Sequence, residues 1–510
     1  MKRLLPLLFA GLMIMMTACS SKQMAEPGVS ESAEEKTVIS TQSVKEDSAT
    51  DEKEPINLIW WTYDADFKKD DFVKVMQKAN EISAEKIGVT VDMKYKNNEQ
   101  LNLDLNTGEY YDIIFSCSWC NDFDGNARKG YYYDLTDIVK EKTPELYAAV
   151  DPWWDPATVD GRIYGVPELK DLGAEVFFIL NQDFFEDEKG MTIPEEMKFD
   201  ELEEYLKIYK EAYPEEYPLF LENYGILGFY QVHERILGKY LVIPYRYAGT
   251  DNGTKIIPFW EDDEFMGMLR TVHKWYEAGY INPDAATYAE GVKPGSPIKS
   301  ITAWTGYKMA SDGLFERKMS RYIGPVMSRA TMQGANIAIN AAADEEHVTA
   351  ALKYMELLYT DREFRDLLAY GIEGEHFNYY NGTVIRTEKG MDNYLLDYYC
   401  TGPAVSVSPA STSEDDPADP DMWKKVYKEY EHALISDTNG FSFDSSAVEA
   451  ECTALNEYVN TYWSELITGT VDPDEKIAEM KEQMNKMGIE KVLNEAQKQL
   501  GEYLTELNSN

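Results

Sequence analysis

Two hydrophobic periods alternate along residues 56–116, and this alternation restricts the fold more than any other feature of the sequence. Residues 56–61, INLIWW, form an apolar run with the length of a buried strand. Apolar side chains then recur at helical spacing until Gly88, a residue that favours the end of a helix. Residues 89–95 alternate apolar and polar side chains, and residues 110–116 form a third strand pattern. Strand, helix, strand and strand in this order predict βαβ units in a largely parallel sheet.

Two segments that follow predicted strands carry the first candidate ligand-binding residues. In sheets of this kind, ligands bind beyond the carboxyl ends of the strands. Residues 61–67, WTYDADF, and residues 117–125, CSWCNDFDG, both place aromatic rings beside carboxylates and amides. Such a mixture suits a polar ligand that also has an apolar face. The candidates are Tyr63, Asp64, Asp66, Trp119, Asn121 and Asp122.

The first 55 residues predict export of the protein and its anchoring to a membrane, and we do not expect them to belong to the folded body. Lys2 and Arg3 precede an apolar run over 4–16, which has the layout of a secretory signal and is too short to span a bilayer. The sequence MTAC that ends at Cys19 resembles the lipobox of bacterial lipoproteins. This resemblance implies a signal peptide over 1–18, a lipid anchor with palmitate on Cys19, and a place on the extracellular face of the bacterial cell membrane. Residues 19–55 are poor in large apolar side chains and are predicted to be a disordered tether.

The composition narrows the classes of partner. Asp and Glu number 91 against 49 Lys and Arg, and the formal net charge of −42 argues against nucleic acid and against an anionic bilayer surface. The chain has 36 tyrosines and 10 tryptophans, which suit partly wet binding clefts, although most of these rings are expected to serve the core. Cys117 and Cys120 are spaced as a CxxC pair, and the sequence leaves open whether they form a disulfide or stay as buried thiols.

Six further segments carry a resemblance to a known family. In order, they are 160–167 (DGRIYGVP), 180–190, 300–310, 334–364, 370–386 and 469–504. The order of the first four resembles the family-1 extracellular solute-binding proteins of ABC importers. The last two are similar to the C-terminal region of the LipO-like lipoproteins within that family. This resemblance covers nearly the whole chain outside the tether.

The resemblance implies an α/β fold of the periplasmic-binding-protein-like type II kind, in which two lobes close like a clamshell about a hinge with more than one crossing. Lobe 1 is expected to take residues 56–168 and 299–330. Lobe 2 is expected to take residues 171–298 and 331–510, including the C-terminal helical region. The candidates at the crossings and on a later loop are Tyr164, Glu168, Trp304, Tyr307, Glu373 and His376. For His376, a hydrogen bond that holds its own loop is the competing interpretation.

The function implied by the resemblance is that of a membrane-anchored lipoprotein that captures a sugar or oligosaccharide between the lobes and delivers it unaltered to the transmembrane subunits of an ABC permease. We expect a monomer with no catalytic residue, no cofactor and no metal. Two alternatives stay open. A peptide or amine would also suit a cleft of aromatic and acidic groups. A cell-surface glycosidase would need two carboxylates about 5 to 10 Å apart across a sugar.

Overall fold

The computed structural model describes residues 54–507 except 64–69, 227, 229–231, 292–294, 305, 308–314, 395 and 397–399. The predicted signal peptide, the tether with Cys19, and the candidates Asp64 and Asp66 therefore lie outside the described residues. The described residues form one compact unit. Among the helices of the described ranges, none combines the length and the apolar character that a membrane span requires.

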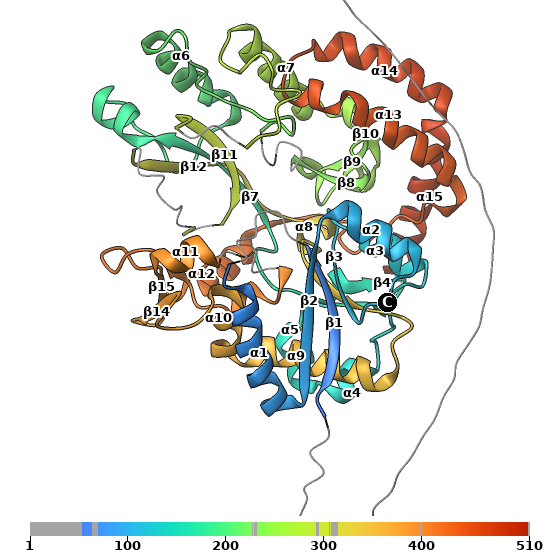
Figure 1. Ribbon diagram of the computed structural model, residues 1–510. Helices are drawn as coiled ribbons and strands as arrows, with labels where there is room; N and C mark the ends of the chain where they lie inside the picture. The colour runs from blue at the N-terminus through green and yellow to red at the C-terminus, as the bar shows by residue number, and fades with distance from the viewer. Residues whose placement is uncertain are drawn as a thin grey trace, which may run out of the picture. The chain divides into compact units, whose positions relative to one another are not determined.

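A five-stranded sheet with the order β2-β1-β3-β13-β6 forms the first half of the fold (Figure 1). Its strands are β1 (Ile56–Tyr63), β2 (Val89–Lys96), β3 (Ile113–Ser116), β6 (Gly165–Pro167) and β13 (Asn336–Ile339). Strand β1 runs parallel to β2 and β3, whereas β13 runs antiparallel to β3 and β6. The parallel βαβ start predicted from the sequence is confirmed, with α1 (Phe72–Ile87) as the connecting helix.

Helices cover both faces of this sheet because its buried strands point apolar side chains to either side. Trp60 faces a core shared with helices α1, α4, α5, α9 and α10. Trp61 faces the opposite core, to which α2 and α3 contribute. The bounds of these helices are α2 (Asn98–Thr107), α3 (Phe123–Arg128), α4 (Ile138–Lys142), α5 (Pro144–Val150), α9 (Glu345–Thr360) and α10 (Arg362–Tyr370). With both faces covered, the carboxyl ends of β1 and β3 are the natural place for a ligand.

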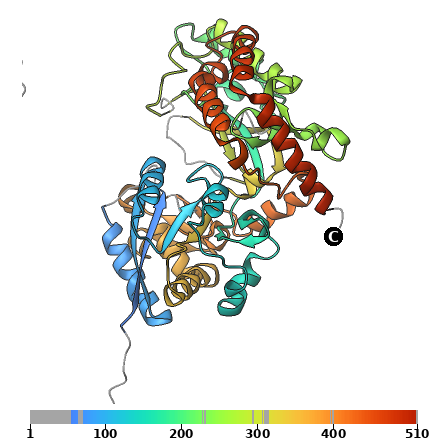
Figure 2. The same ribbon diagram turned by 90° about the vertical axis from the view of Figure 1, so that its right-hand side faces the viewer.

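A second group of sheets and helices shares a separate hydrophobic core. Its main sheet has the order β11-β7-β12-β17, and a small sheet has the order β10-β9-β8. The strands are β7 (Ala174–Asn181), β8 (His233–Leu237), β9 (Leu241–Pro244), β10 (Ile257–Pro258), β11 (Ile298–Ala303), β12 (Arg317–Met327) and β17 (Leu434–Ile435). The helices are α6 (Leu202–Ala212), α7 (Asp263–Glu277), α13 (Glu449–Ile467), α14 (Pro473–Met487) and α15 (Ile489–Leu507). Figures 1 and 2 show the three C-terminal helices in red beside the green elements of this group.

The chain passes between the two main sheets three times. We call the half built on β1 lobe 1 and the half built on β7 lobe 2. Crossing 1 joins β6 to β7 through residues 168–173, and crossing 2 joins β12 to β13 through 328–335 and contains α8 (Arg329–Met332). Crossing 3 joins β16 to β17 through 412–433 and contains α12 (Met422–Glu429). Two α/β lobes joined by repeated crossings agree with the predicted clamshell fold.

The predicted division of the chain between the lobes is wrong in two adjacent stretches. Residues 299–330 were expected in lobe 1, but β11 and β12 both pair with β7 in lobe 2. Residues from 331 onward were expected in lobe 2, but β13 pairs with β3 and β6, and α9 packs in the core of lobe 1. An apolar strand pattern shows that a strand is buried without showing which sheet it joins, so the position of crossing 2 could not be read from it.

A small sheet, β14-β15-β16, lies beside α10 in the segment before crossing 3. Its strands are β14 (Phe377–Tyr380), β15 (Thr383–Arg386) and β16 (Ala410–Ser411), and α11 (Glu388–Asn393) follows the hairpin. The turn between β14 and β15 is formed by Asn381 and Gly382, with φ of 49° and 84°. Two positive φ values are what a tight hairpin turn requires, and Asn-Gly adopts them readily. The two-stranded β4-β5 hairpin, β4 (Thr158–Val159) and β5 (Arg162–Ile163), precedes crossing 1.

Candidate ligand-binding site

Three aromatic rings gather at the carboxyl ends of β1 and β3. The ring of Tyr63 lies 5.1 Å from that of Trp119 at 83° and 6.4 Å from that of Phe115 at 29°. Trp119 is 44% exposed, and its Nε1 donates a hydrogen bond of 2.7 Å to the carbonyl oxygen of Gly334 in crossing 2. Edge and face contacts of this kind fix a ring in one orientation. Trp119 therefore presents a fixed aromatic surface to solvent at the strand ends.

The loop that carries Trp119 is attached to crossing 2 by its neighbour as well. The backbone N–H of Ser118 donates to the carbonyl of Gln333 at 3.1 Å, and its hydroxyl donates to the carbonyl of Ala330 at 2.7 Å. These contacts and the Trp119 bond join lobe 1 to a segment that leads into lobe 2. The orientation of the Trp119 ring is thus coupled to the crossing.

The other two candidates on this loop, Asn121 and Asp122, hydrogen bond to the protein itself. Asn121 is 2% exposed, and its side-chain Nδ2 faces the carbonyl of Phe115 and the hydroxyl of Tyr132, each at 3.4 Å. Its φ of 62° lies in the left-handed region, which asparagine tolerates better than most residues. Asp122 is exposed and caps α3, accepting from the N–H of Gly125 at 3.3 Å. The sequence predicted that the Asn121 side chain faces a ligand. This prediction is corrected, because the amide of Asn121 is buried and hydrogen bonds to protein atoms.

The candidates at crossing 1 are also mostly internal. Tyr164 is half-buried and packs against the core around Trp61. Glu168 is 3% exposed, and its Oε2 accepts from the N–H of Gly402 at 3.0 Å. Burial raises the pKa of Glu168 well above its usual value, although the Arg365 guanidinium acts in the opposite direction. Glu168 therefore links crossing 1 to the segment before crossing 3 instead of facing an open cleft, which corrects the sequence expectation.

A second aromatic cluster forms where β11 ends. Trp304 stacks on Trp423 with ring centroids 5.1 Å apart at 29°, and Tyr307 meets Trp304 edge-on at 4.9 Å. The Nε1 of Trp304 also lies 3.2 Å from the sulfur of Met422. Trp304, Tyr307 and Trp423 are all half-buried. Lobe 2 thus presents aromatic rings at crossing 3, just as lobe 1 presents Trp119 beside crossing 2.

Sequence reasoning missed Trp423. It is the second residue of α12 and directly follows the acidic segment 411–421. Its partner Trp304 is more than a hundred residues away in the sequence, and no local pattern connects the two. The two half-buried tryptophans can be recognised as neighbours only when the positions of the strands in the fold are known.

The loop candidates Glu373 and His376 fall in different settings. Glu373 is exposed, whereas His376 is fully buried. The Nδ1 of His376 accepts from the N–H of Ile372 at 2.8 Å, and its Nε2 lies 3.1 Å from a carboxylate oxygen of Asp71, just before α1. The hydrogen bond from His376 is the main reason that the pKa of Asp71 falls to about 2. His376 therefore holds its own loop against the start of α1, as the competing interpretation proposed, and is not placed to contact a ligand.

One group of metal-capable side chains occurs among the described residues. Ligand atoms of Asp71, Glu375 and His376 all lie within 4.8 Å of one another. The ammonium group of Lys389 contacts both carboxylates, and Lys74 pairs with Glu375. These cations neutralise the carboxylates, and hydrogen bonds from Lys389 and Lys74 lower the pKa of Glu375 to about 2. The arrangement is that of an ion-pair network that fastens the loop to α1.

A hydrogen-bonded ion pair lies where lobe 1 meets crossing 2. Arg329 is 6% exposed, and its guanidinium donates to both carboxylate oxygens of Asp124 in α3, at 2.9 and 2.7 Å. Gln333 donates to the same carboxylate at 2.7 Å, and the hydroxyl of Ser442 also donates to it. On the other side, the buried Glu234 of lobe 2 hydrogen bonds to the backbone of Arg329. We call Asp124, Arg329, Gln333 and Ser442 the crossing network.

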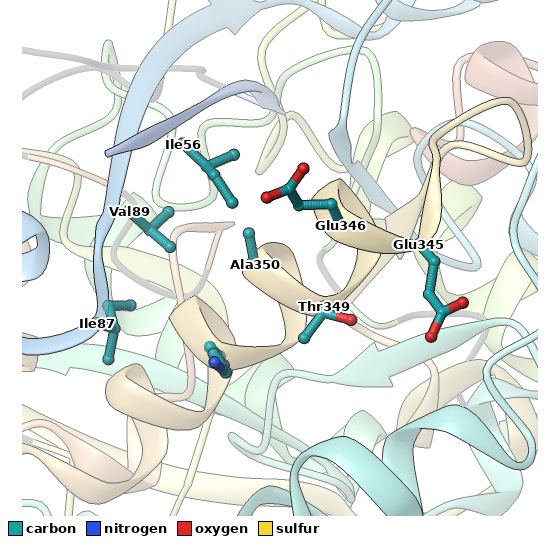
Figure 3. A pocket seen from close by; sticks show the side chains of 8 residues that line it. Ile56, Ile87, Val89, Glu345, Glu346, Thr349 and Ala350 are labelled. Carbon is teal, nitrogen blue, oxygen red and sulfur yellow. The ribbon is translucent and has the colours of Figure 1, made fainter. Parts of the chain in front are cut away.

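Two hollows on the described part of the surface lie away from these aromatic clusters. One of about 370 Å³ lies between the strand starts of lobe 1 and α9, where Figure 3 shows Ile56 and Val89 opposite Glu346 and Ala350. It is at the amino end of β1, the end of the sheet away from Trp119. Another, of about 340 Å³, is lined by the bulged part of β12 around Arg321. Aromatic rings and crossings, rather than these hollows, mark the candidate site.

Comparison with known proteins indicates the class of protein to which this chain is similar. A family model described as a domain of unknown function, DUF3502, matches residues 437–505. A carbohydrate ABC transporter substrate-binding protein of Streptococcus pneumoniae serotype 4 is 28% identical over 457 residues, which are 86% of this chain and 89% of the relative. The crystal structure of the N-glycan transport solute-binding protein NgtS from Streptococcus pneumoniae covers 88% of this chain and 99% of its own, with 26% identity and a TM-score of 0.75. NgtS in complex with Man5GlcNAc matches with 26% identity over the same shares of the two chains and a TM-score of 0.73.

Together with the two lobes and their crossings, these matches define the chain as a solute-binding protein of the ABC-importer class. The resemblance predicted from the sequence is confirmed at this level. Within the class, the chain is similar to the pneumococcal proteins named above along nearly its whole described length. The glycosidase alternative is set aside, because the relatives are transport proteins that bind a solute and not enzymes.

Proposed function

We propose that this chain captures an oligosaccharide between its lobes and delivers it unaltered to the permease of an ABC importer. The observation that carries the proposal is the pair of aromatic clusters at the crossings, Trp119 with Tyr63 and Trp304 with Trp423. The likeness to NgtS, whose structure was solved with Man5GlcNAc, supports the same ligand class. Neither the aromatic clusters nor the likeness to NgtS calls for a chemical reaction of the ligand. We therefore propose that the ligand is released unaltered.

The physical reason is the two-sided character of a sugar ring. One face of a pyranose carries mostly C–H groups and stacks on an aromatic ring, while its hydroxyls need hydrogen-bond partners to replace bound water. The rings of Trp119 and Trp304 are held by hydrogen bonds from their indole N–H groups, so they are oriented before the ligand arrives. Rigid rings lose little conformational entropy on binding, which favours affinity.

The proposed contacts are divided between the lobes. Lobe 1 contributes Tyr63 and Trp119, and lobe 2 with crossing 3 contributes Trp304, Tyr307 and Trp423. Asp64 and Asp66, which directly follow β1 in the sequence, would supply carboxylates for hydroxyl groups. Because rings belong to both sides, closing the lobes would enclose the ligand and form the surface that the permease recognises.

Delivery to a permease also requires a place at the membrane. We propose that the chain is exported as a lipoprotein, that Cys19 carries the lipid anchor, and that residues 20–55 let the folded body move above the bilayer. A single flexible tether of this length keeps a monomeric binding protein near its permease without fixing its orientation. Binding proteins of ABC importers face the outside of the cell, which agrees with this arrangement.

Isothermal titration calorimetry of the full chain with Man5GlcNAc tests the proposal. We expect binding without added metal, and a loss of about 1 to 3 kcal/mol in Trp119→Ala and in Trp304→Ala, a scale taken from stacking on nucleic-acid bases. Tyr213→Ala is the matched control, because this ring is 40% exposed and packs on Phe184 and Tyr209 in lobe 2. No heat with Man5GlcNAc or other neutral oligosaccharides, together with binding of a peptide or an amine, would refute the carbohydrate assignment. Unchanged affinity in both tryptophan variants would remove the clusters from the site.

A further inference from the structure

Cys117 and Cys120 lie opposite each other in the turn that carries Trp119. The backbone N–H of Cys117 donates a hydrogen bond of 2.8 Å to the carbonyl of Cys120. Both side chains are buried, with 0% and 1% exposure, and the two thiols are close enough to hydrogen bond. The side chains of the residues between them, Ser118 and Trp119, hydrogen bond to crossing 2.

This geometry suits a disulfide without rearrangement of the fold. The backbone hydrogen bond between the two residues closes the turn and brings their side chains together. The thiol of Cys117 already lies within hydrogen-bonding distance of the thiol of Cys120, so a disulfide requires only a short approach of the two sulfur atoms. The two sulfur atoms are not joined in this structure.

We propose that Cys117 and Cys120 are a redox pair that closes to a disulfide and stiffens the turn under Trp119. The thiolate of one cysteine attacks an external low-molecular-weight disulfide, forming a mixed disulfide and releasing one thiol. The second cysteine of the pair then attacks the sulfur of the first and releases the other external thiol. Two protein thiols are oxidised to one disulfide, and one external disulfide is reduced to two thiols, so atoms and electrons balance.

Burial determines when this reaction occurs. The thiolate is the reacting form, and burial together with the neighbouring Cys120 thiol raises the pKa of the Cys117 thiol well above its usual value. The folded, reduced protein is therefore a slow substrate for an external disulfide. Oxidation proceeds while the chain is folding or when the turn opens, so mild urea accelerates it.

The other cysteines provide controls. Cys400 lies in the same hydrophobic cluster as the pair, and Cys452 lies in the core of lobe 2. A bond between Cys117 and Cys120 predicts that neither of these two is consumed. The variants Cys400→Ser and Cys452→Ser should oxidise as the unaltered chain does, whereas Cys117→Ser and Cys120→Ala should not.

The test is mass spectrometry of the full chain in detergent after reduction and exposure to hydroxyethyl disulfide in low urea. We expect a loss of the mass of two hydrogens, and a proteolytic fragment in which Cys117 is joined to Cys120. A chain that keeps four titratable thiols at positions 117, 120, 400 and 452, or a bond to Cys400, would overturn the inference. Mapping the unaltered chain keeps the test decisive if a serine variant fails to fold.

The consequence for binding rests on the proposed function. Oxidation should raise the affinity for Man5GlcNAc roughly two- to tenfold above that of the reduced chain, because the disulfide adds a covalent restraint to the hydrogen bonds that already hold the Trp119 turn. Equal affinities of the reduced and oxidised chain would refute this consequence. The mass measurement needs no ligand, so a chain that forms the disulfide and binds no oligosaccharide would refute the proposed function alone.

Discussion

Replacing Asp124 by alanine should destabilise the protein more than any exposed substitution, because it removes the acceptor at the centre of the crossing network. Arg329 is 6% exposed and gives two of its hydrogen bonds to Asp124, while its remaining ones go to the carbonyls of Asp155 and Thr158. Gln333 would lose a bond of 2.7 Å at the same time. Removing one partner of a buried ion pair leaves an uncompensated charge and costs about 3 to 5 kcal/mol.

This magnitude can be separated into its parts by a double-mutant cycle. Arg329→Met alone should cost about as much as Asp124→Ala, but the double variant should lose less than the sum, because no buried charge is left alone. The matched control is Asp122→Ala, two residues away, which removes a 3.3 Å capping bond on an exposed side chain and places alanine at a φ of 36°. A lost cap costs about 1 kcal/mol, and alanine in the left-handed region costs about 1 kcal/mol more, so the control should still lose less than Asp124→Ala.

The assay is urea unfolding followed by tryptophan fluorescence and by circular dichroism, since coincident curves are needed before a single free energy of unfolding is assigned. Burial raises the pKa of Asp124, but the charge and hydrogen bonds of Arg329 outweigh this effect, so the pKa is below its ordinary value of 3.8. The stabilisation is therefore complete above pH 3.8 and is lost as the pH falls through the lower folded value. A cost below about 1 kcal/mol at neutral pH, or an equal cost in Asp122→Ala, would refute the argument.

Three other outcomes follow from the structure. His376→Ala should lower the free energy of unfolding by about 1 to 3 kcal/mol and leave oligosaccharide affinity unchanged, because the buried ring holds its loop to Asp71. If calorimetry showed weaker oligosaccharide binding at unchanged stability, this role would be contradicted. Trp423→Ala should weaken oligosaccharide binding by about as much as Trp304→Ala, since the two rings stack at 5.1 Å, and an unaffected titration would place Trp423 outside the site. Chelation with EDTA should change neither the affinity nor the melting temperature, because Lys389 already neutralises Asp71 and Glu375; a lower melting temperature would point to a bound metal.

The start of lobe 1 could be predicted from the sequence because local signals determine it. The run predicted at 56–61 became β1, the helical period ended at Gly88 as expected, and Gly88 caps α1 with φ of 68°. The third predicted strand began three residues early, since β3 starts at Ile113. The sheets that β11 and β13 join could not be predicted, because hydrophobic patterns carry no information about which buried strands become neighbours.

The candidate site was predictable in part for a related physical reason. Trp119 and Trp304 could be named from the sequence because both follow predicted strands, and the structure places their rings beside the crossings, where they remain candidates for ligand contact. Asn121 and Glu168 look the same in sequence as ligand-binding polar residues, yet each satisfies a buried backbone or side-chain group. A single sequence does not distinguish a polar side chain that meets a ligand from one that meets its own chain.

The position of β13 in the middle of the first sheet has a consequence for synthesis. Strand β13 separates β3 from β6, and its residues 336–339 come after the long stretch 174–327, which belongs to the other lobe. The amino-terminal half cannot close its sheet until two thirds of the polypeptide has been made. A fragment that ends before residue 336 therefore leaves two strand edges exposed and prone to aggregate, so neither lobe can be produced as a simple truncation.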